Sequence, residues 1–367
     1  MRPEAPIESV AARAYTIPTD APEADGTFAW TETTLVTVHV QAGGKTGFGY
    51  TYGHACQTAL IETMLAKALQ RRDAMDVEGA WSAMQHQVRN IGRGGLAAMS
   101  IAAVDIALWD LKARLLDLPL VTLLGTMRQE VPIYGSGGFT SYSDEQLRQQ
   151  LQGWVQRDGC RFVKMKVGSD PDDDPRRVAV ARHAIGDASL FVDANGAYSA
   201  RQAISLAGAF VAEADIAWFE EPVSSDDLAG LHFVRQHVPE MVEVAAGEYG
   251  YDLDYVRRML EAQAVDVQQA DITRCAGITG FLRVAALCDA HHTGLSAHCA
   301  PSAHLHAACA VPGLRHLEWF HDHVRIEHLL FDGAPTPKAG VIRPDLARPG
   351  LGLDFKTADA ERYAVKG

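Results

Sequence analysis

Two lysines lie near the end of a short apolar segment that the sequence predicts to be a buried strand. The segment runs from Arg161 to Gly168 and reads RFVKMKVG. Because side chains alternate along a strand, Lys164 and Lys166 share one face. Two buried ammonium groups side by side repel each other and lose water, which is unfavourable without compensation. The pair therefore predicts a nearby cluster of carboxylates or an anionic ligand.

Three acidic residues at the ends of later apolar runs could bind a metal ion. They are Asp193, Glu220 and Glu248. Carboxylates suit a hard cation, and Mg²⁺ is the best candidate because it keeps open positions for water and substrate oxygens. Zinc is disfavoured because the set holds no cysteine or histidine. The alternatives are that each acid caps the helix that follows it, and that the acids and lysines form a purely structural ion-pair network.

Three further predictions concern acid–base chemistry. Lys166 would face a metal-bound substrate, where a second lysine and a divalent cation lower its pKa, as a general base requires. His298 follows Asp271 by one predicted strand, and that carboxylate could fix the tautomer of the imidazole ring. The alternative for His298 is a buried core histidine. Glu318 could be a protonated acid that bonds a bound anion or an ion-pair partner, and its position leaves both open.

The elements that must position these residues repeat along the chain from about residue 130. Each repeat is a short apolar run followed by an amphipathic helical pattern, and the spacing from Lys166 onward is 20 to 28 residues. A strand–helix unit of this size, repeated about eight times, predicts a β/α barrel whose strand ends converge on one mouth. The runs end near Gly135, Lys166, Asp193, Glu220, Glu248, Asp271, His298 and Glu318.

The first third of the chain has a different pattern. β-Branched alternation over residues 7–17 and 29–50, with a Gly43-Gly44 turn, predicts an antiparallel sheet. A segment from Thr19 to Thr27 is rich in Pro, Asp, Glu and Gly and predicts a mobile loop. Helical periodicity follows over residues 56–70, 76–90 and 96–117.

We expect three parts in the chain. Residues 1–127 form an N-terminal α+β domain, and residues 128–335 form a TIM-like barrel that carries the candidate catalytic residues. Residues 336–367, which are rich in Pro and Gly, leave the barrel and pack back on the first domain. The fold class is therefore α/β.

Composition and charge restrict the partners and the location. The 367-residue chain has a formal net charge of −13, which argues against nucleic acid and anionic membrane surfaces as partners. Its six cysteines are scattered without a CxxC pair, which suggests buried thiols in a reducing cytosol. The N-terminus lacks an apolar signal core, and no run approaches transmembrane length. We expect a cytoplasmic protein.

Taken together, these motifs resemble the enolase superfamily, and within it the mandelate racemase subgroup. The resemblance covers nearly the whole chain and implies a (β/α)7β-type TIM barrel with a capping domain. Lys164-Met165-Lys166 resembles the KxK motif of that family, and Glu220 is the first residue of a Glu-Glu-Pro motif. The resemblance implies roles for the following residues: magnesium ligands Asp193, Glu220 and Glu248; an Asp271–His298 dyad; and Glu318 as the acid that bonds the substrate carboxylate.

The family fold implies that two segments of the first domain lie over the barrel mouth and choose the substrate. They are the loop at residues 19–27 and the segment 47–54. Polar side chains there could bond sugar hydroxyls, whereas an aryl substrate would favour an apolar lid; the alternative is that the loop is merely solvated. The predicted substrate-binding residues are Glu23, Tyr50, His54 and Asn195.

The resemblance also implies the chemistry. With Mg²⁺, Lys164 and Glu318 gathering charge on the substrate carboxylate, Lys166 and His298 would stand on opposite faces of an enediolate. We expect a carbon–oxygen lyase that removes the α-proton of a sugar acid (an aldonate or aldarate) and eliminates water, giving a 2-keto-3-deoxy acid. The alternatives are a racemase or epimerase of a 2-hydroxy acid, a cycloisomerase of a sugar-acid lactone, and a non-catalytic sugar-acid-binding protein. Family members are commonly dimers or octamers, so a homo-oligomer is expected.

Overall fold

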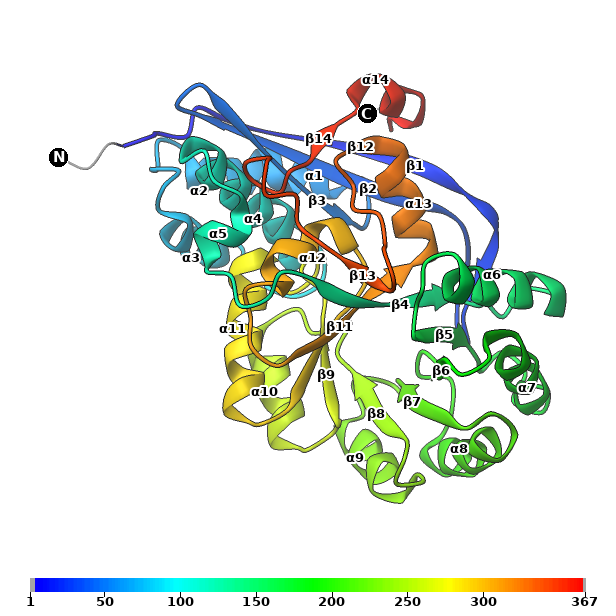
Figure 1. Cartoon of the computed structure of the whole chain (residues 1–367). Coiled ribbons are helices and arrows are strands. Elements are labelled where there is room, and N and C mark those ends of the chain that lie inside the picture. Colours follow the sequence, from blue (N-terminus) through cyan, green and yellow to red (C-terminus); the bar gives the residue numbers. More distant parts are fainter. Residues whose placement is uncertain (1–3, 366–367) are drawn as a thin grey trace.

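Eight parallel strands form a closed barrel in the computed structural model, which describes residues 4–365 (Figure 1). Neighbours in the chain are neighbours in the barrel, and β11 closes the ring by pairing with β4. The strands are β4 (Val131–Gly137), β5 (Phe162–Lys166), β6 (Ser189–Asp193), β7 (Ile216–Glu220), β8 (Glu243–Ala246), β9 (Val267–Ala270), β10 (Gly294–Ala297) and β11 (Leu314–Phe320).

Helices connect these strands and surround the barrel. Apolar side chains on the outer faces of the strands and the inner faces of the helices form the main core. The eighth strand leads into α13 (His321–Leu330), which runs from the barrel toward the capping domain. The seven connecting helices are α6 (Asp144–Gln156), α7 (Asp174–Ile185), α8 (Ala200–Ala214), α9 (Leu228–His237), α10 (Leu253–Glu261), α11 (Gly277–Ala290) and α12 (Pro301–Ala308). This arrangement confirms the predicted (β/α)7β barrel.

An antiparallel sheet of three strands forms the first part of the capping domain. Long helix α4 packs against β3 so closely that Cβ atoms at Gly47 and Gly49 would collide with the carbonyl oxygens of Ala107 and Ala103. A separate apolar core lies between this sheet and the helices. The elements are β1 (Ser9–Ala24), β2 (Ala29–Ala42), β3 (Lys45–Tyr52), α1 (Gln57–Leu60), a π-helical turn (Ile61–Leu65), α2 (Ala66–Leu69), α3 (Val77–Gln87), α4 (Leu96–Leu115) and α5 (Leu120–Leu124).

The predicted loop at residues 19–27 is mostly strand, so that prediction is wrong for its first part. β1 continues to Ala24 because a register shift between Pro18 and Glu23 absorbs the irregular segment, after which Glu23 pairs with Trp30. The turn itself is short. The Asp25 carboxylate closes the turn by accepting hydrogen bonds from the backbone N–H groups of Thr27 (2.6 Å) and Phe28 (2.8 Å).

The C-terminal segment returns to the capping domain after a brief contact with the barrel. Strand β13 (Val341–Ile342) pairs with β4, and β12 (Phe331–Asp332) pairs with β14 (Asp354–Phe355). The Leu351 N–H donates to Asp110 Oδ1 of α4 at 2.7 Å. The last elements are α14 (Thr357–Ala360) and a 3-10 turn (Glu361–Tyr363). The domain boundaries at residues 127 and 335 stay predictions.

None of the helices within residues 4–365 combines the length and apolar character that a bilayer crossing requires.

Candidate active site and metal centre

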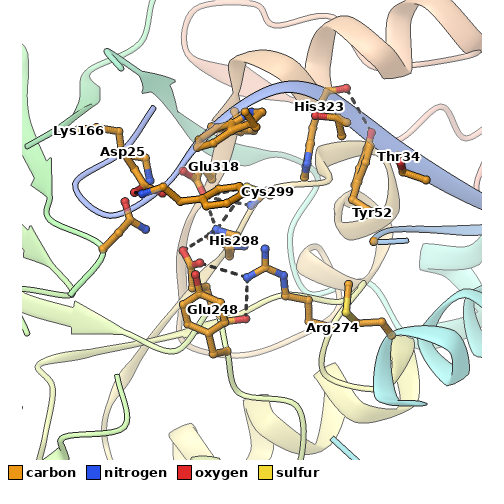
Figure 2. Close-up of a pocket in the computed structure, with 18 of the residues that line it drawn as sticks. Asp25, Thr34, Tyr52, Lys166, Glu248, Arg274, His298, Cys299, Glu318 and His323 are labelled. Atoms are coloured by element: carbon orange, nitrogen blue, oxygen red, sulfur yellow. Dashed lines mark hydrogen bonds and ion pairs between the residues drawn. The ribbon is translucent and has the colours of Figure 1, made fainter. Parts of the chain in front are cut away.

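A cavity of about 390 Å³ lies where the capping domain meets the carboxyl ends of the barrel strands (Figure 2). Of the predicted site residues, Lys166, Asn195, Glu248, His298 and Glu318 line it directly. The other lining residues are Asp25, Phe28, Trp30, Glu32, Thr33, Thr34, Tyr52, Gly53, Met99, Tyr249, Arg274, Cys299, Phe320 and His323.

The three predicted metal ligands meet in this region. Asp193, Glu220 and Glu248 each offer a carboxylate oxygen, and these oxygens lie within 4.8 Å of one another. All three residues are buried. The strand register explains the meeting, because Asp193 of β6 lies directly opposite Glu220 of β7, and Lys166 of β5 opposite Asp193.

Both lysines point into the acidic cluster. Lys164 is fully buried, and its Nζ lies 2.5 Å from Glu220 Oε1, 2.8 Å from Glu318 Oε1 and 3.2 Å from Asp193 Oδ2. Lys166 Nζ lies 2.6 Å from Asp193 Oδ2. Lys166 reaches the cavity, whereas Lys164 lies beneath it among the carboxylates. The two lysines therefore have different access to a ligand.

The charge state of Lys166 differs from the sequence-based expectation. Burial disfavours its ammonium form, but the Asp193 carboxylate beside it raises the pKa of Lys166 above its ordinary value. The expected lowering relied on the neighbouring Lys164 and on a divalent cation, and Lys164 alone does not outweigh the carboxylates. Among the protein groups alone, carboxylates outnumber ammonium groups around Lys166, so its pKa is raised.

His298 and Asp271 form the predicted hydrogen-bonded pair. Asp271 Oδ2 lies 2.9 Å from His298 Nδ1, so the other ring nitrogen is left for the cavity. That nitrogen, Nε2, lies 3.1 Å from Glu248 Oε2 and 3.5 Å from Glu318 Oε2 (Figure 2). Burial disfavours the imidazolium, but the anionic groups around it raise the pKa of His298 well above its ordinary value.

Glu318 connects the lysine side of the site to the histidine side. Its Oε1 accepts from Ser136 Oγ at 2.5 Å and pairs with Lys164, while its Oε2 accepts from the Cys299 N–H at 3.1 Å. Burial favours the neutral acid, but Lys164 holds the pKa of Glu318 below its ordinary value. Among the protein groups alone, Glu318 behaves as an ion-pair partner.

The donor set fits a hard divalent cation. Carboxylate oxygens are the ligands that Mg²⁺ prefers, and three come from neighbouring strand ends. The cluster also carries more negative charge than its lysines balance. Burial and the neighbouring Asp193 carboxylate raise the pKa of Glu220, which is the sign of crowded acids that a cation would relieve.

Only one of the four predicted substrate-binding residues reaches the cavity. Asn195 lines it, held in a left-handed conformation (φ 46°) by a 2.9 Å bond from its N–H to Asp193 Oδ1. Glu23 is buried behind Trp30, whose indole N–H donates to it at 2.8 Å. Tyr50 is also buried, and its hydroxyl donates to Glu327 at 2.6 Å. His54 is exposed, and its Nδ1 accepts from the Cys56 N–H.

The sequence reasoning missed several residues that line the cavity. Arg274 follows Asp271 by one turn, and its Nη1 lies 3.2 Å from Glu248 Oε1. The Cys299 thiol lies 3.4 Å from both His298 Nε2 and Glu318 Oε2. Adjacency to His298 was the available signal for Cys299. Phe28 and Trp30 give the hairpin an aromatic face, which the polar composition of residues 19–27 concealed.

Comparisons with known proteins agree with this geometry. Residues 12–125 match the N-terminal domain model of mandelate racemase and muconate lactonizing enzyme, and residues 146–360 match the enolase C-terminal domain-like model. The chain is 33% identical to 3,6-anhydro-alpha-L-galactonate cycloisomerase of Streptomyces coelicolor over 95% of this chain and 98% of that protein. It is 30% identical to L-talarate/galactarate dehydratase of Salmonella typhimurium over 79% and 74% of the two chains.

Solved structures give the same result. A mandelate racemase/muconate lactonizing enzyme-like protein from Rubrobacter xylanophilus superposes with a TM-score of 0.96 at 51% identity, covering 98% of this chain and all of that one. A racemase from Streptomyces coelicolor with bound magnesium has a TM-score of 0.91 at 32% identity, with coverage of 98% and 100%. The chain therefore belongs to the mandelate racemase and muconate lactonizing enzyme family of the enolase superfamily.

Proposed function

We propose that this protein is a magnesium-dependent enzyme that removes the α-proton of a sugar acid and then eliminates water from the β-carbon. The product would be a 2-keto-3-deoxy sugar acid. The observation that carries the proposal is the pairing of two proton-transfer groups, Lys166 and His298, with one triad of carboxylates beside one cavity. The similar cycloisomerase and dehydratase both have sugar acids as named substrates, which supports this substrate class.

Asp193, Glu220 and Glu248 would hold the metal. Bound magnesium supplies positive charge that offsets Asp193 beside Lys166 and stabilises charge developing on the substrate carboxylate. Lys164 would add a fixed ammonium group beneath that carboxylate, since its four-carbon chain is buried and its Nζ lies among the acids.

Lys166 and His298 would divide the proton transfers. One removes the α-proton, and the other donates a proton to the departing β-hydroxyl, so that water leaves without a build-up of hydroxide. Asp271 would keep the His298 Nδ1 protonated, which directs Nε2 toward the substrate. Which group acts as the base depends on the configuration of the substrate at its α-carbon.

Purified enzyme with Mg²⁺ should be screened against a library of mono- and dicarboxylate sugar acids, with semicarbazide trapping of α-keto acids as the readout. A product one water lighter than the substrate supports dehydration. Lys166→Ala and His298→Asn should then be compared on the active substrate, by turnover and by deuterium exchange at the α-carbon. Exchange retained in one variant and lost in the other identifies the base. Full turnover in both variants would contradict the assignment.

A second candidate reaction is the opening of a cyclic sugar acid through the same first step. In that reaction the β-oxygen that departs stays attached as a hydroxyl, so product and substrate have equal mass. The aromatic residues Phe28, Trp30 and Phe320 at the cavity favour it, because a closed ring has fewer hydroxyls and a more apolar surface than an open chain. A keto acid of unchanged mass from an anhydro sugar acid or a lactone would identify this reaction.

A further inference from the structure

The two sides of the cavity differ in charge. The barrel and α13 contribute the basic side chains Lys166, Arg274, His298 and His323 together with two acids, Glu248 and Glu318. Among the described lining residues, the capping domain contributes two acids and no lysine, arginine or histidine. Its lining residues are Asp25, Phe28, Trp30, Glu32, Thr33, Thr34, Tyr52, Gly53 and Met99. Among the described lining residues, the basic side chains therefore come from the barrel and α13, whereas the charged side chains of the capping domain are acids.

The cations on the barrel side already have carboxylate partners. Lys166 pairs with Asp193 at 2.6 Å. Arg274 Nη1 lies 3.2 Å from Glu248, and its Nε lies 3.6 Å from Asp271 Oδ2. Its guanidinium also lies 5.2 Å from the centre of the Tyr249 ring. Arg274 is thus paired with two carboxylates, one of which belongs to the candidate metal ligand Glu248.

His323 is the remaining basic side chain near the outer part of the cavity, and it is neutral. Its Nδ1 accepts a hydrogen bond from the Ala300 N–H at 3.3 Å, which requires an unprotonated nitrogen. The ring stacks on Tyr52 with 3.5 Å between centroids. Burial lowers the pKa of His323 to about 3. It can offer a polar contact to a hydroxyl but no positive charge to a carboxylate.

The acids on the capping side lie in and beside the β1–β2 hairpin. The Asp25 carboxylate is held in place by the turn that it closes. Glu32 is exposed on β2, two residues beyond Trp30. Figure 2 shows Asp25 and the capping strand over the cavity that holds His298 and Glu248. Both residues belong to the capping side of the cavity, whereas the candidate metal ligands lie at the strand ends of the barrel.

We propose that the site selects monocarboxylates, with the single carboxylate toward the metal ligands and an uncharged hydroxyl-bearing tail or ring toward the capping domain. The inference rests on the proposed function, because that function sets which end of the ligand lies at the metal. A second carboxylate on the capping side would lose water against Phe28 and Trp30 and would meet acids, with no unpaired cation among the described lining residues of that side. Like charges in such a setting repel.

Binding to the Lys166→Met variant with Mg²⁺ tests the inference without requiring turnover. Two pairs of ligands share their stereochemistry and differ in the far carboxylate: D-galactonate with galactarate, and D-gluconate with D-glucarate. In the pair that binds, we expect the monocarboxylate to bind at least about tenfold more tightly, which is the scale of one unfavourable charge contact. Equal or tighter binding of the dicarboxylate would overturn the inference. No binding of any of the four would also overturn it.

Turnover by the unaltered enzyme separates this inference from the proposed function. A monocarboxylate preference in binding, without keto-acid formation from any sugar acid, would overturn the proposed function and leave the selectivity standing. Keto-acid formation from a dicarboxylate, with equal or better kcat/KM than from its monocarboxylate partner, would overturn the selectivity and leave the proposed function standing.

A charge reversal makes the test specific. Glu32→Lys should shift the ratio of the two dissociation constants toward the dicarboxylate by about tenfold. Glu240→Lys is the matched control, since Glu240 is exposed between α9 and β8, at the opposite end of the barrel, and changes the net charge equally. A shift of the same size in both variants would mean that net charge alone sets the preference, and would overturn the role of Glu32.

Discussion

The two ends of the barrel interior have opposite chemistry although the same strands supply both. At the base, Phe191 of β6 stacks on Trp218 of β7 with 5.1 Å between ring centroids. Two residues further along the same strands lie Asp193 and Glu220. Side chains two residues apart on a strand point to the same face. On the inward face of β6 and of β7, an aromatic side chain is therefore followed directly by an acidic one. The base stabilises the barrel, and the mouth holds the reactive groups.

Two buried histidines show what this difference does to the same side chain. His316 at the base lies among aromatic rings, 4.9 Å from Tyr134 and 5.4 Å from Trp218 between centroids, and burial lowers its pKa to about 3. His298 at the mouth is equally buried, but the carboxylates and the thiol around it raise its pKa. Burial alone therefore does not fix the charge of a histidine; the neighbouring groups do.

The largest expected effect is loss of activity at the mouth. Lys166→Met should lower kcat/KM on the active sugar acid by about 10³-fold, which is typical of losing a positioned acid–base group. Lys338→Met is the control, since Lys338 lines a second cavity at the base of the barrel. Steady-state kinetics with Mg²⁺ measures both. Equal losses in the two variants would remove the distinction between mouth and base.

A substitution at the base should affect stability instead. Phe191→Ala should lower the free energy of unfolding by about 3 kcal/mol, through lost apolar burial and the cavity left beside Trp218. Phe191→Leu should cost less because it leaves a smaller cavity. Denaturant titration measures both, and kcat/KM is compared where each variant is folded. A larger fall in kcat/KM than for Lys166→Met would show that the base also governs the chemistry.

The mouth was predictable from sequence because its residues follow from strand register. Once Lys166, Asp193 and Glu220 are recognised as strand ends, parallel pairing places them side by side. Glu248 and His298 lie one or two residues beyond their strands, and the same logic brings them to the cavity. These contacts depend on local spacing and on one rule of barrel geometry.

The capping side could not be predicted in the same way. Its contribution depends on how one domain docks on another, and no spacing in the chain encodes that. Tyr50 and Tyr52 share a face of β3, yet Tyr52 lines the cavity while Tyr50 bonds Glu327 of α13. Glu23 is close to the turn in sequence and pairs with Trp30, but its carboxylate is buried behind the Trp30 indole. Composition identified polar side chains there, but it could not separate those that line the cavity, such as Asp25 and Tyr52, from those that do not.

A smaller effect should separate the two histidines by pH. The pKa of His316 is about 3 in the folded protein and about 6.5 when unfolded, so below pH 6.5 the unfolded state binds the extra proton. Stability therefore falls as the pH drops from 6.5 toward 3, by about 2 kcal/mol at pH 5.

His316→Phe keeps a ring in the aromatic cluster and removes this titration. Its free energy of unfolding, measured by denaturant titration at pH 7 and pH 5, should fall less than that of the unaltered protein by about the same 2 kcal/mol. Identical pH dependence in the two proteins would show that His316 is protonated in the folded state, and the contrast with His298 would fail.

The smallest expected effect concerns two buried cysteines. The Cys299 thiol contacts both His298 and Glu318, whereas Cys288 packs in the apolar core of α11. Cys299→Ala should lower kcat/KM by less than about tenfold, because His298 keeps Asp271 and Glu318 keeps Lys164 and Ser136. Cys299→Ser should restore part of that loss by returning a polar group to the same place. Cys288→Ala should instead lower the Tm and leave kcat/KM nearly unchanged. If Cys299→Ala changes only the Tm, the thiol contributes to packing and not to the reaction.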